Sequence, residues 1–456
     1  MSSLKVSGNP PKIKNGQIKN LLKINRRSTS AIKSILLLFC LLVVSFNSFG
    51  QTNGDYRTRA NGNWGNNGTW QVYNGGWVNC GAGDYPGAAA GAGTVTILNN
   101  VTLNVSPANA IGSLVIQANL THNGNANRTI TISGDFSIST GTVSLSENNG
   151  RITTLNIAGN FSMTGGTITE NSNASGSIIF NKAGTQTFTK SAGTISNTIN
   201  FTVNTGSTLD MGTSVLNGSS GSFTLSSGAG IITQHAQGIS TTAGTGCIQV
   251  TGTKTYNTGT NFTYNGTSAQ LTGNGLPLTV NNLTINNSSG VTLSGATTTT
   301  GTLDLQQGAL SLNGNTLTVN GDISHTGAGT GTITGSTTSS LTINGNGALN
   351  NLYFTSATEN LNNFTLNRAG SNISLSSNLT IAGTLALTNG IISATGKTIS
   401  LTSSAAASLT AGVGSYIDGT VSRAMTNAGG TYIFPVGSTC GSHWLTFSSV
   451  SGTSTT

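Results

Sequence analysis

Residues 302–319 have the sequence TLDLQQGALSLNGNTLTV, which contains three apolar pairs that recur at a constant interval. The pairs are Leu303/Leu305, Leu310/Leu312 and Leu317/Val319. Alternation with a period of two places both members of a pair on one face of a short strand. Gly308 and Gly314 fall between the strands, where a tight corner needs unusual backbone angles. Three such sides predict a coil of about 21 residues, a length typical of solenoid repeats.

The same block recurs along the chain. Residues 280–319 align with 361–401, so that Leu283 corresponds to Phe364, Gly301 to Gly383 and Leu303 to Leu385. A weaker copy spans 201–232. One coil cannot bury its apolar face alone, but stacked coils form a continuous apolar column. We therefore predict an all-β fold, a right-handed parallel β-helix or solenoid. An antiparallel meander remains an alternative, because hairpins also use Gly and Asn corners.

Charge separates the first fifty residues from the rest. The chain has 18 Lys and Arg against 10 Asp and Glu, but eight of the basic residues precede residue 50 and all acidic ones follow it. The remainder is therefore neutral, which argues against a nucleic-acid partner. A basic segment, the apolar run Ile35–Val44 and small residues up to Gly50 predict a signal peptide over 1–50. An uncleaved amphipathic anchor is the alternative. No transmembrane segment is expected in the mature chain.

The two ends of the mature chain depart from the repeat, which spans 94–412. Residues 51–93 contain four clustered aromatic residues, namely Trp64, Trp70, Tyr73 and Trp77. Exposed, they would form a platform for sugar rings, and this is the candidate ligand site. Buried, they would cap the first coil, which is the interpretation that we favour. Residues 413–456 break the coil pattern and indicate either a second cap or the start of a truncated module.

A resemblance to a family rests on motifs at both ends and in the middle. The opening YRTRANGNWGNNGTWQVYNGGWV, the block TGTLDLQQGALSLNGNTLTV and the late stretches GSYIDGTVSRAM and GGTYIFPVGS resemble the large β-strand-repeat surface proteins of Bacteroidetes. This resemblance covers nearly all of the mature chain. It implies an exported, adhesin-like protein associated with type IX secretion. A C-terminal sorting domain, common in that family, is not recognised before Thr456, which leaves the secretion route open.

Reactive groups are few and scattered. The four histidines form no metal or catalytic pattern, the cysteines show no CxxC spacing, and no cofactor motif is present. The best carboxylate pair is Asp304 and Asp322, nearly one coil apart with His325 nearby, but corner residues that bond local amides explain both equally well. We therefore assign no catalytic residue, no metal ligand and no cofactor.

These observations favour a secreted or cell-surface structural protein, adhesin-like, whose polar ladders contact extracellular polysaccharides or other surfaces. Two alternatives stay open. One is a carbohydrate-active β-helix enzyme, a lyase or hydrolase that would use Asp304 and Asp322. The other is an ice-binding solenoid, although a regular TxT motif in every coil is not visible in the sequence.

Overall fold

Residues 50–448 are described by a computed structural model, except 123, 148–149, 173, 347–350 and 427–429; the side chains of 369–371 are also outside the description. The predicted signal peptide and the last part of the predicted C-terminal segment, 449–456, lie outside this range. Strands dominate, and nearly all pair in parallel with strands of the neighbouring coil. The prediction of a parallel β-solenoid is confirmed, and the antiparallel meander is wrong.

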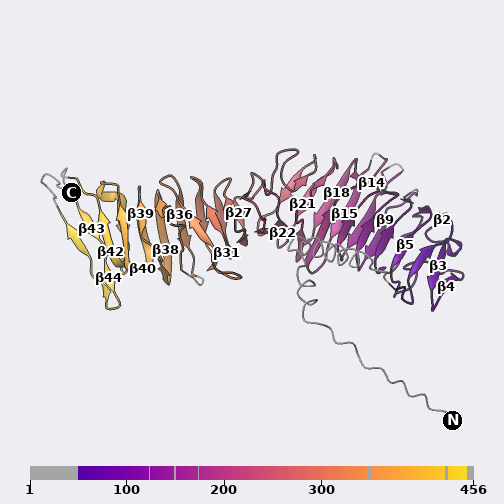
Figure 1. Cartoon of the computed structure of the whole chain (residues 1–456), viewed down its shortest axis with the longest axis horizontal. Coiled ribbons are helices and arrows are strands. Elements are labelled where there is room, and N and C mark those ends of the chain that lie inside the picture. Colours follow the sequence, from indigo (N-terminus) through magenta and orange to yellow (C-terminus); the bar gives the residue numbers. More distant parts are fainter. Residues whose placement is uncertain are drawn as a thin grey trace, which may run out of the picture. The chain divides into compact units, whose positions relative to one another are not determined.

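Each coil has up to three sides, and each side contributes one strand to a sheet (Figure 1). The first side forms a 14-stranded sheet of β1 (Tyr56–Thr58), β3 (Trp70–Tyr73), β4 (Trp77–Asn79), β5 (Val95–Ile97), β7 (Leu114–Ile116), β10 (Phe136–Ile138), β13 (Phe161–Met163), β16 (Gly184–Lys190), β19 (Ser207–Asp210), β22 (Gly230–Thr233), β25 (Asn261–Tyr264), β28 (Leu283–Asn286), β31 (Leu303–Gln307) and β34 (Ile323–Ser324).

The second side is divided among three shorter sheets. The first contains β2 (Gly62–Asn63), β6 (Val101–Thr102), β8 (Leu120–Thr121), β11 (Thr142–Ser144), β14 (Thr167–Thr169) and β17 (Thr194–Ile195). The second pairs β20 (Leu216–Asn217) with β23 (Ile248–Gln249). The third contains β26 (Gln270–Leu271), β29 (Val291–Thr292), β32 (Ala309–Ser311) and β35 (Thr332–Thr334).

The third side forms two sheets. One contains β9 (Arg128–Ile132), β12 (Thr153–Ile157), β15 (Gly176–Phe180), β18 (Ile199–Val203), β21 (Phe223–Leu225) and β24 (Lys254–Tyr256). The other has ten strands and starts on the third side with β27 (Thr279–Val280), β30 (Thr297–Thr299), β33 (Thr316–Val319) and β36 (Ser340–Asn344). In the last coils it extends around more than one side, because the long strands β38 (Asn363–Ser374) and β40 (Leu385–Leu401) pair along separate segments, and it also includes β37 (Asn360–Leu361), β39 (Leu379–Ile381), β41 (Leu409–Ala411) and β42 (Tyr416–Arg423).

The strand register shows where each coil closes on the next. Leu303 pairs with Leu283 and with Ile323, so these two coils are equal in length and close to the predicted value. Elsewhere the coils vary, from a short one between Val95 and Leu114 to a much longer one between Ile231 and Phe262. The extra residues of the longer coil lie in the loop 234–247 between β22 and β23. Insertions at corners leave the stacked strands in register, because closing a longer loop costs little additional entropy.

Alternate residues of each strand point inward and form the core. Leu303, Leu305 and Leu317 are all fully buried, as their spacing predicts. A stack of phenylalanines runs through three coils, with ring centroids 5.2 Å apart between Phe136 and Phe161 and 4.7 Å apart between Phe161 and Phe188. Each fully buried side chain of this size contributes about 1.5–3 kcal/mol relative to the exposed state.

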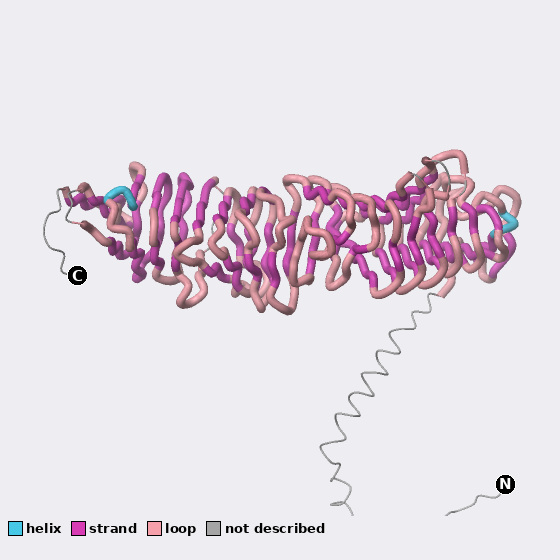
Figure 2. The backbone as a smooth tube through the Cα atoms, turned by 90° about the horizontal axis from the view of Figure 1, so that it is seen from above, coloured by secondary structure: helices cyan, strands magenta, loops and turns pink. Residues whose placement is uncertain are grey.

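The ends of the stack differ from its middle. At the first coil, β1 pairs in parallel with β5 on one side but antiparallel with β3 on the other, and β3 continues into β4. At the other end, two antiparallel pairs follow β42: β43 (Tyr432–Phe434) with β46 (Leu445–Phe447), and β44 (Gly437–Ser438) with β45 (Gly441–Ser442). Short 3₁₀ turns lie at Asn67–Thr69 and Ala406–Ser408, one near each end (Figure 2).

Candidate functional site

The four aromatic residues predicted as a ligand platform do not share one surface. Trp64 and Trp70 are 0% exposed. Their rings meet edge to face at 5.1 Å, and both indole N–H groups are used internally: Trp64 donates to the carbonyl of Pro86 and Trp70 to that of Trp64. Fully buried rings cannot stack on a sugar, so the platform prediction is wrong for these two residues. They pack at the start of the core, as the favoured cap interpretation expects.

Tyr73 and Trp77 are half-buried on the β3–β4 hairpin. Their rings meet edge to face at 5.4 Å, and the Arg57 guanidinium lies 4.3 Å from the centre of the Trp77 ring. A cation over an aromatic face is a stabilising contact in its own right. Only this pair of the predicted platform therefore retains surface that a ligand could contact.

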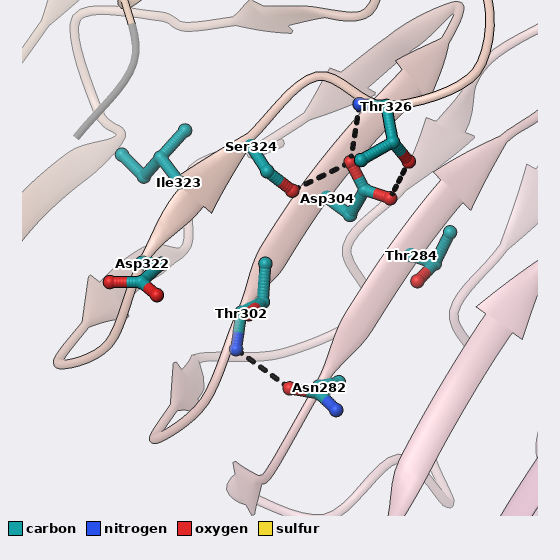
Figure 3. Close-up of a pocket in the computed structure, with 8 residues that line it drawn as sticks. All are labelled: Asn282, Thr284, Thr302, Asp304, Asp322, Ile323, Ser324 and Thr326. Carbon is teal, nitrogen blue, oxygen red and sulfur yellow. Dashed lines mark hydrogen bonds between the residues drawn. The ribbon is translucent and has the colours of Figure 1, made fainter. Parts of the chain in front are cut away.

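A groove of about 420 Å³ lies over the outer face of β28, β31 and β34 (Figure 3). Its lining includes two rows of outward side chains, Asn282/Thr302/Asp322 and Thr284/Asp304/Ser324, together with Thr326 and Ile323. The members of each row recur at one constant interval in the sequence. The rows arise because the coils here have the same length, so equivalent outward positions come into register. This is the candidate functional site.

Asp304 is fixed inside the groove by hydrogen bonds. Its carboxylate accepts from the Ser324 hydroxyl at 2.8 Å, the Gln306 side-chain amide at 2.8 Å and the Thr326 backbone N–H at 2.9 Å, and also from the Thr326 hydroxyl. Burial alone would raise the pKa of Asp304, but these hydrogen bonds, those from Thr326 above all, hold it below its ordinary value. Asp304 is therefore an ionised carboxylate whose acceptor capacity is largely used by its own surroundings.

Asp322 is the accessible carboxylate of the groove, with 46% of its side chain exposed. The Arg368 guanidinium lies 3.9 Å away, and the Arg368 side chain is itself fully buried. Arg368 reaches across the preceding coils, donating to the carbonyl oxygen of Gly321 at 2.9 Å and to that of Asn344. This anchoring holds a positive charge next to Asp322 without exposing it to solvent.

Sequence reasoning correctly brought Asp304 and Asp322 to adjacent coils. Figure 3 shows the two carboxylates apart from each other, on different rows of the groove. A two-carboxylate glycosidase needs one acid with a raised pKa to protonate the leaving group. The pKa of Asp304 is shifted in the opposite direction. Asp304 thus lacks the proton that a general acid needs at neutral pH.

His325 follows β34 and packs edge to face on Tyr353, with ring centroids 5.0 Å apart. Burial lowers the pKa of His325, and the nearby Asp304 carboxylate opposes this effect only in part. The imidazole is therefore neutral at neutral pH. It is not among the residues that line the groove, although the sequence places it close to them.

Two hydroxyl groups in the groove remain available to a ligand. In the part of the chain that the structure describes, the Thr284 and Thr302 hydroxyls form no hydrogen bond with the protein. With the Asp322 carboxylate they give the groove three polar groups on adjacent coils. Sequence reasoning did not single out these threonines. The signal was available, because Thr284, Asp304 and Ser324 recur at one constant interval in the sequence.

The described residues contain no group of three or more His, Cys, Asp or Glu side chains that could hold a metal ion. None of the helices in the described part of the chain could span a membrane. Cys80 and Cys247 are buried as free thiols, whereas Cys440 is an exposed one.

The fold and the groove together define a parallel β-solenoid with a neutral, hydroxyl-rich exterior. No protein-family model, no curated protein and no solved structure matches this chain.

Proposed function

We propose that this protein is an exported structural, adhesin-like solenoid that binds neutral polysaccharides outside the cell through the groove on β28, β31 and β34. The free hydroxyls of Thr284 and Thr302, which line the same groove as the Asp322 carboxylate, carry this proposal. Hydroxyl and carboxylate groups on rigid strands suit sugar hydroxyls, because little conformational entropy is lost on binding. The basic, apolar leader and the resemblance to Bacteroidetes surface proteins support export, with type IX secretion as the proposed route.

The groove is favoured over the hairpin aromatics as the main contact. Trp77 already has one ring contact with Arg57 and another with Tyr73, which limits the free ring area. The groove in contrast provides a concave surface with polar groups from adjacent coils. Concave sites with a few convergent polar groups are typical of ligand binding.

A double substitution of Thr284→Val and Thr302→Val tests the proposal. It removes both hydroxyls while keeping the branched shape and strand preference of each side chain. A panel of neutral polysaccharides is screened on an array, and the best ligand is titrated calorimetrically. We expect the variant to bind about ten-fold or more weakly, because each lost hydrogen bond is worth about 0.5–1.5 kcal/mol.

The matched control is Thr202→Val on β18, which is also half-buried and outward-facing but lies on a different sheet. It is expected to bind like the wild type. Equal affinity of the double variant and the wild type would place binding elsewhere, and a Trp77→Ala variant then tests the hairpin. Release of reducing ends from any polysaccharide of the panel would favour the enzymatic alternative instead.

A further inference from the structure

A straight column of threonines runs along the ten-stranded sheet. Successive register pairs join Thr279 to Thr298, Thr298 to Thr318, Thr318 to Thr342 and Thr342 to Thr365, across β27, β30, β33, β36 and β38. We call these five residues the threonine column. Ala386 occupies the next coil and Thr410 the one after it. β36, β38 and β40 follow one another in Figure 1.

The column could not be seen in the sequence, because its spacing is irregular. Thr298 follows Thr279 after a short coil, whereas the coil that ends at Thr342 and the one that ends at Thr365 are longer. The differences in coil length lie in the loops, and the hydrogen bonds between strands keep the threonines in register. In space, the side chains therefore recur at the strand spacing of about 4.8 Å.

The hydroxyls of the column lie at outward positions and are not used in hydrogen bonds within the described part of the protein. Among the described residues, none of the five forms a side-chain hydrogen bond with the protein. Each lies at a half-buried outward position in its strand. Threonine is branched at Cβ, which restricts its rotamers in a strand. Each coil consequently presents one methyl group and one hydroxyl at the equivalent outward position.

Neighbouring side chains hold this surface rigid. On one side, the Asn344 amide donates to Asn320 at 3.0 Å, and the Asn389 amide donates to Asn367 at 2.7 Å. On the other side, the Asn363 amide donates to Ser340 at 3.3 Å and its oxygen accepts from the backbone N–H of Thr384 at 3.0 Å. These flanking positions are uncharged. The threonine column thus lies on an ordered, neutral face. The side chains that form hydrogen bonds with each other are in the rows that flank the column.

We propose that the threonine column is an ice-binding surface. At every coil, water next to this face could form a hydrogen bond with one hydroxyl and enclose one methyl group. The distance between successive coils is close to the shortest lattice repeat of the oxygen atoms in hexagonal ice. Ligand sites typically combine a concave shape with a few convergent polar groups, whereas the column repeats one outward group from coil to coil and, with its two flanking rows, contains no charged residue. The regular, unbonded hydroxyls therefore fit a water lattice better than a glycan.

This inference is independent of the proposed glycan groove. The groove lies on β28, β31 and β34 of the 14-stranded sheet, whereas the column lies on the ten-stranded sheet. The two surfaces belong to different sides of the same coils. Each can consequently be altered without substituting a residue of the other.

Ice capture and thermal hysteresis of the purified full chain test the inference. The central variant is Thr342→Lys, which places a long charged side chain in the middle of the column. Its matched control is Thr202→Lys on β18, an outward half-buried threonine of another sheet, which only two further threonines, Thr224 and Thr255, adjoin in succession along its row. We expect the wild type and the control to enter a slowly growing ice hemisphere and to show thermal hysteresis. Thr342→Lys is expected to lose both, with an unchanged circular dichroism spectrum.

Three outcomes would overturn the proposal. The first is exclusion of the wild type from ice, and the second is equal ice capture by Thr342→Lys and Thr202→Lys. The third is retention of the wild type on crystalline cellulose, lost in Thr342→Lys, without any ice capture, which would make the column a polysaccharide surface. Binding of soluble glycans in the groove, measured on the same samples, reports separately on the adhesin proposal.

Discussion

Buried polar side chains mark the places where the solenoid departs from a simple apolar core. His122 follows β8 and is 1% exposed. Burial lowers the pKa of His122 and Arg128 acts in the same direction, which together outweigh the opposing effect of the backbone at Ala126 and Leu145. The folded state therefore holds this imidazole in its neutral form. In the unfolded chain, the same group regains an ordinary pKa of about 6.5.

The stability of the protein should fall as the pH drops below about 6.5. Above that value His122 is neutral in both states, so it gives no pH dependence; below it, the unfolded chain binds the proton first and is favoured. The decline stops only below the lowered pKa of the folded state. Urea unfolding at a series of pH values measures this loss of stability. The His122→Leu variant should lose less stability than the wild type as the pH drops below about 6.5.

His443→Leu is the control, because His443 is exposed. It replaces the same residue type at an exposed position, so it controls for the loss of a histidine side chain outside the core. His235 and His325 also have pKa values lowered by burial, so part of the slope remains in the His122 variant. An identical slope in wild type and His122→Leu would show that His122 is not kept neutral by the fold.

The corners between strands determine how closely successive coils approach each other. Gly301 and Gly383 were aligned from the sequence, and the structure gives them the same surroundings. A Cβ at Gly301 would overlap the side-chain oxygens of Asn281 and Asn282, and one at Gly383 those of Asn362 and Asn363. In both repeats the second asparagine accepts from the backbone N–H of the threonine that follows the glycine. The long-range sequence match thus corresponds to a shared corner.

Gly321→Ala tests this close approach. A Cβ at Gly321 would overlap the backbone carbonyl of Gly301 in the preceding coil, and that backbone cannot move without disturbing the strand pairing. We expect a loss of about 1–3 kcal/mol in the free energy of unfolding, the usual cost of overpacking. The measurement is the shift of the urea unfolding curve.

Gly295→Ala provides the comparison, because a Cβ there meets nothing within 4 Å and the backbone needs no left-handed conformation. Its stability should equal or slightly exceed that of the wild type, since alanine restricts the unfolded chain. If both variants lost the same stability, glycine would matter at these corners for reasons other than the distance between coils.

Over the whole molecule, contacts join each coil mainly to its two neighbours. The strand pairs link β10 to β7 and β13, and β13 in turn to β16. Such an array approximates a one-dimensional chain of units, whose stability is a sum of local terms and nearest-neighbour interfaces. Damage in one coil should therefore spread only a short way along the axis.

The Phe161→Ala variant tests whether a loss of packing in one coil stays confined to its neighbours. The substitution removes the middle ring of the Phe136–Phe161–Phe188 stack and should cost about 3–5 kcal/mol locally. Hydrogen exchange measured by mass spectrometry should rise in β10, β13 and β16 and stay unchanged in β38 and β40. Leu278→Ala, at a side chain 66% exposed, should change neither region. A uniform rise along the chain would instead indicate one cooperative unit.

Much of the fold could be predicted from the strand pattern. Leu303, Leu310 and Leu317 indicated three sides with inward apolar residues, and all three are fully buried. The aromatic residues were harder to place. Trp64 and Trp70 are of the residue type that forms sugar-binding platforms. The sequence alone does not show that their indole N–H groups donate to backbone carbonyls within the core.

The sequence by itself determined short inward-facing strands, since glycine corners and period-two apolar pairs specify them wherever they recur. It favoured a parallel solenoid but left an antiparallel meander open, and the parallel pairing was decided by the tertiary structure. Only the tertiary structure decided which outward side chains become neighbours. Backbone pairing brings Thr318 beside Thr342 across coils of unequal length, and Asp304 beside Ser324 across coils of equal length. Loop length is nearly free of energetic cost while strand register is not, so the surfaces follow the hydrogen bonds between coils.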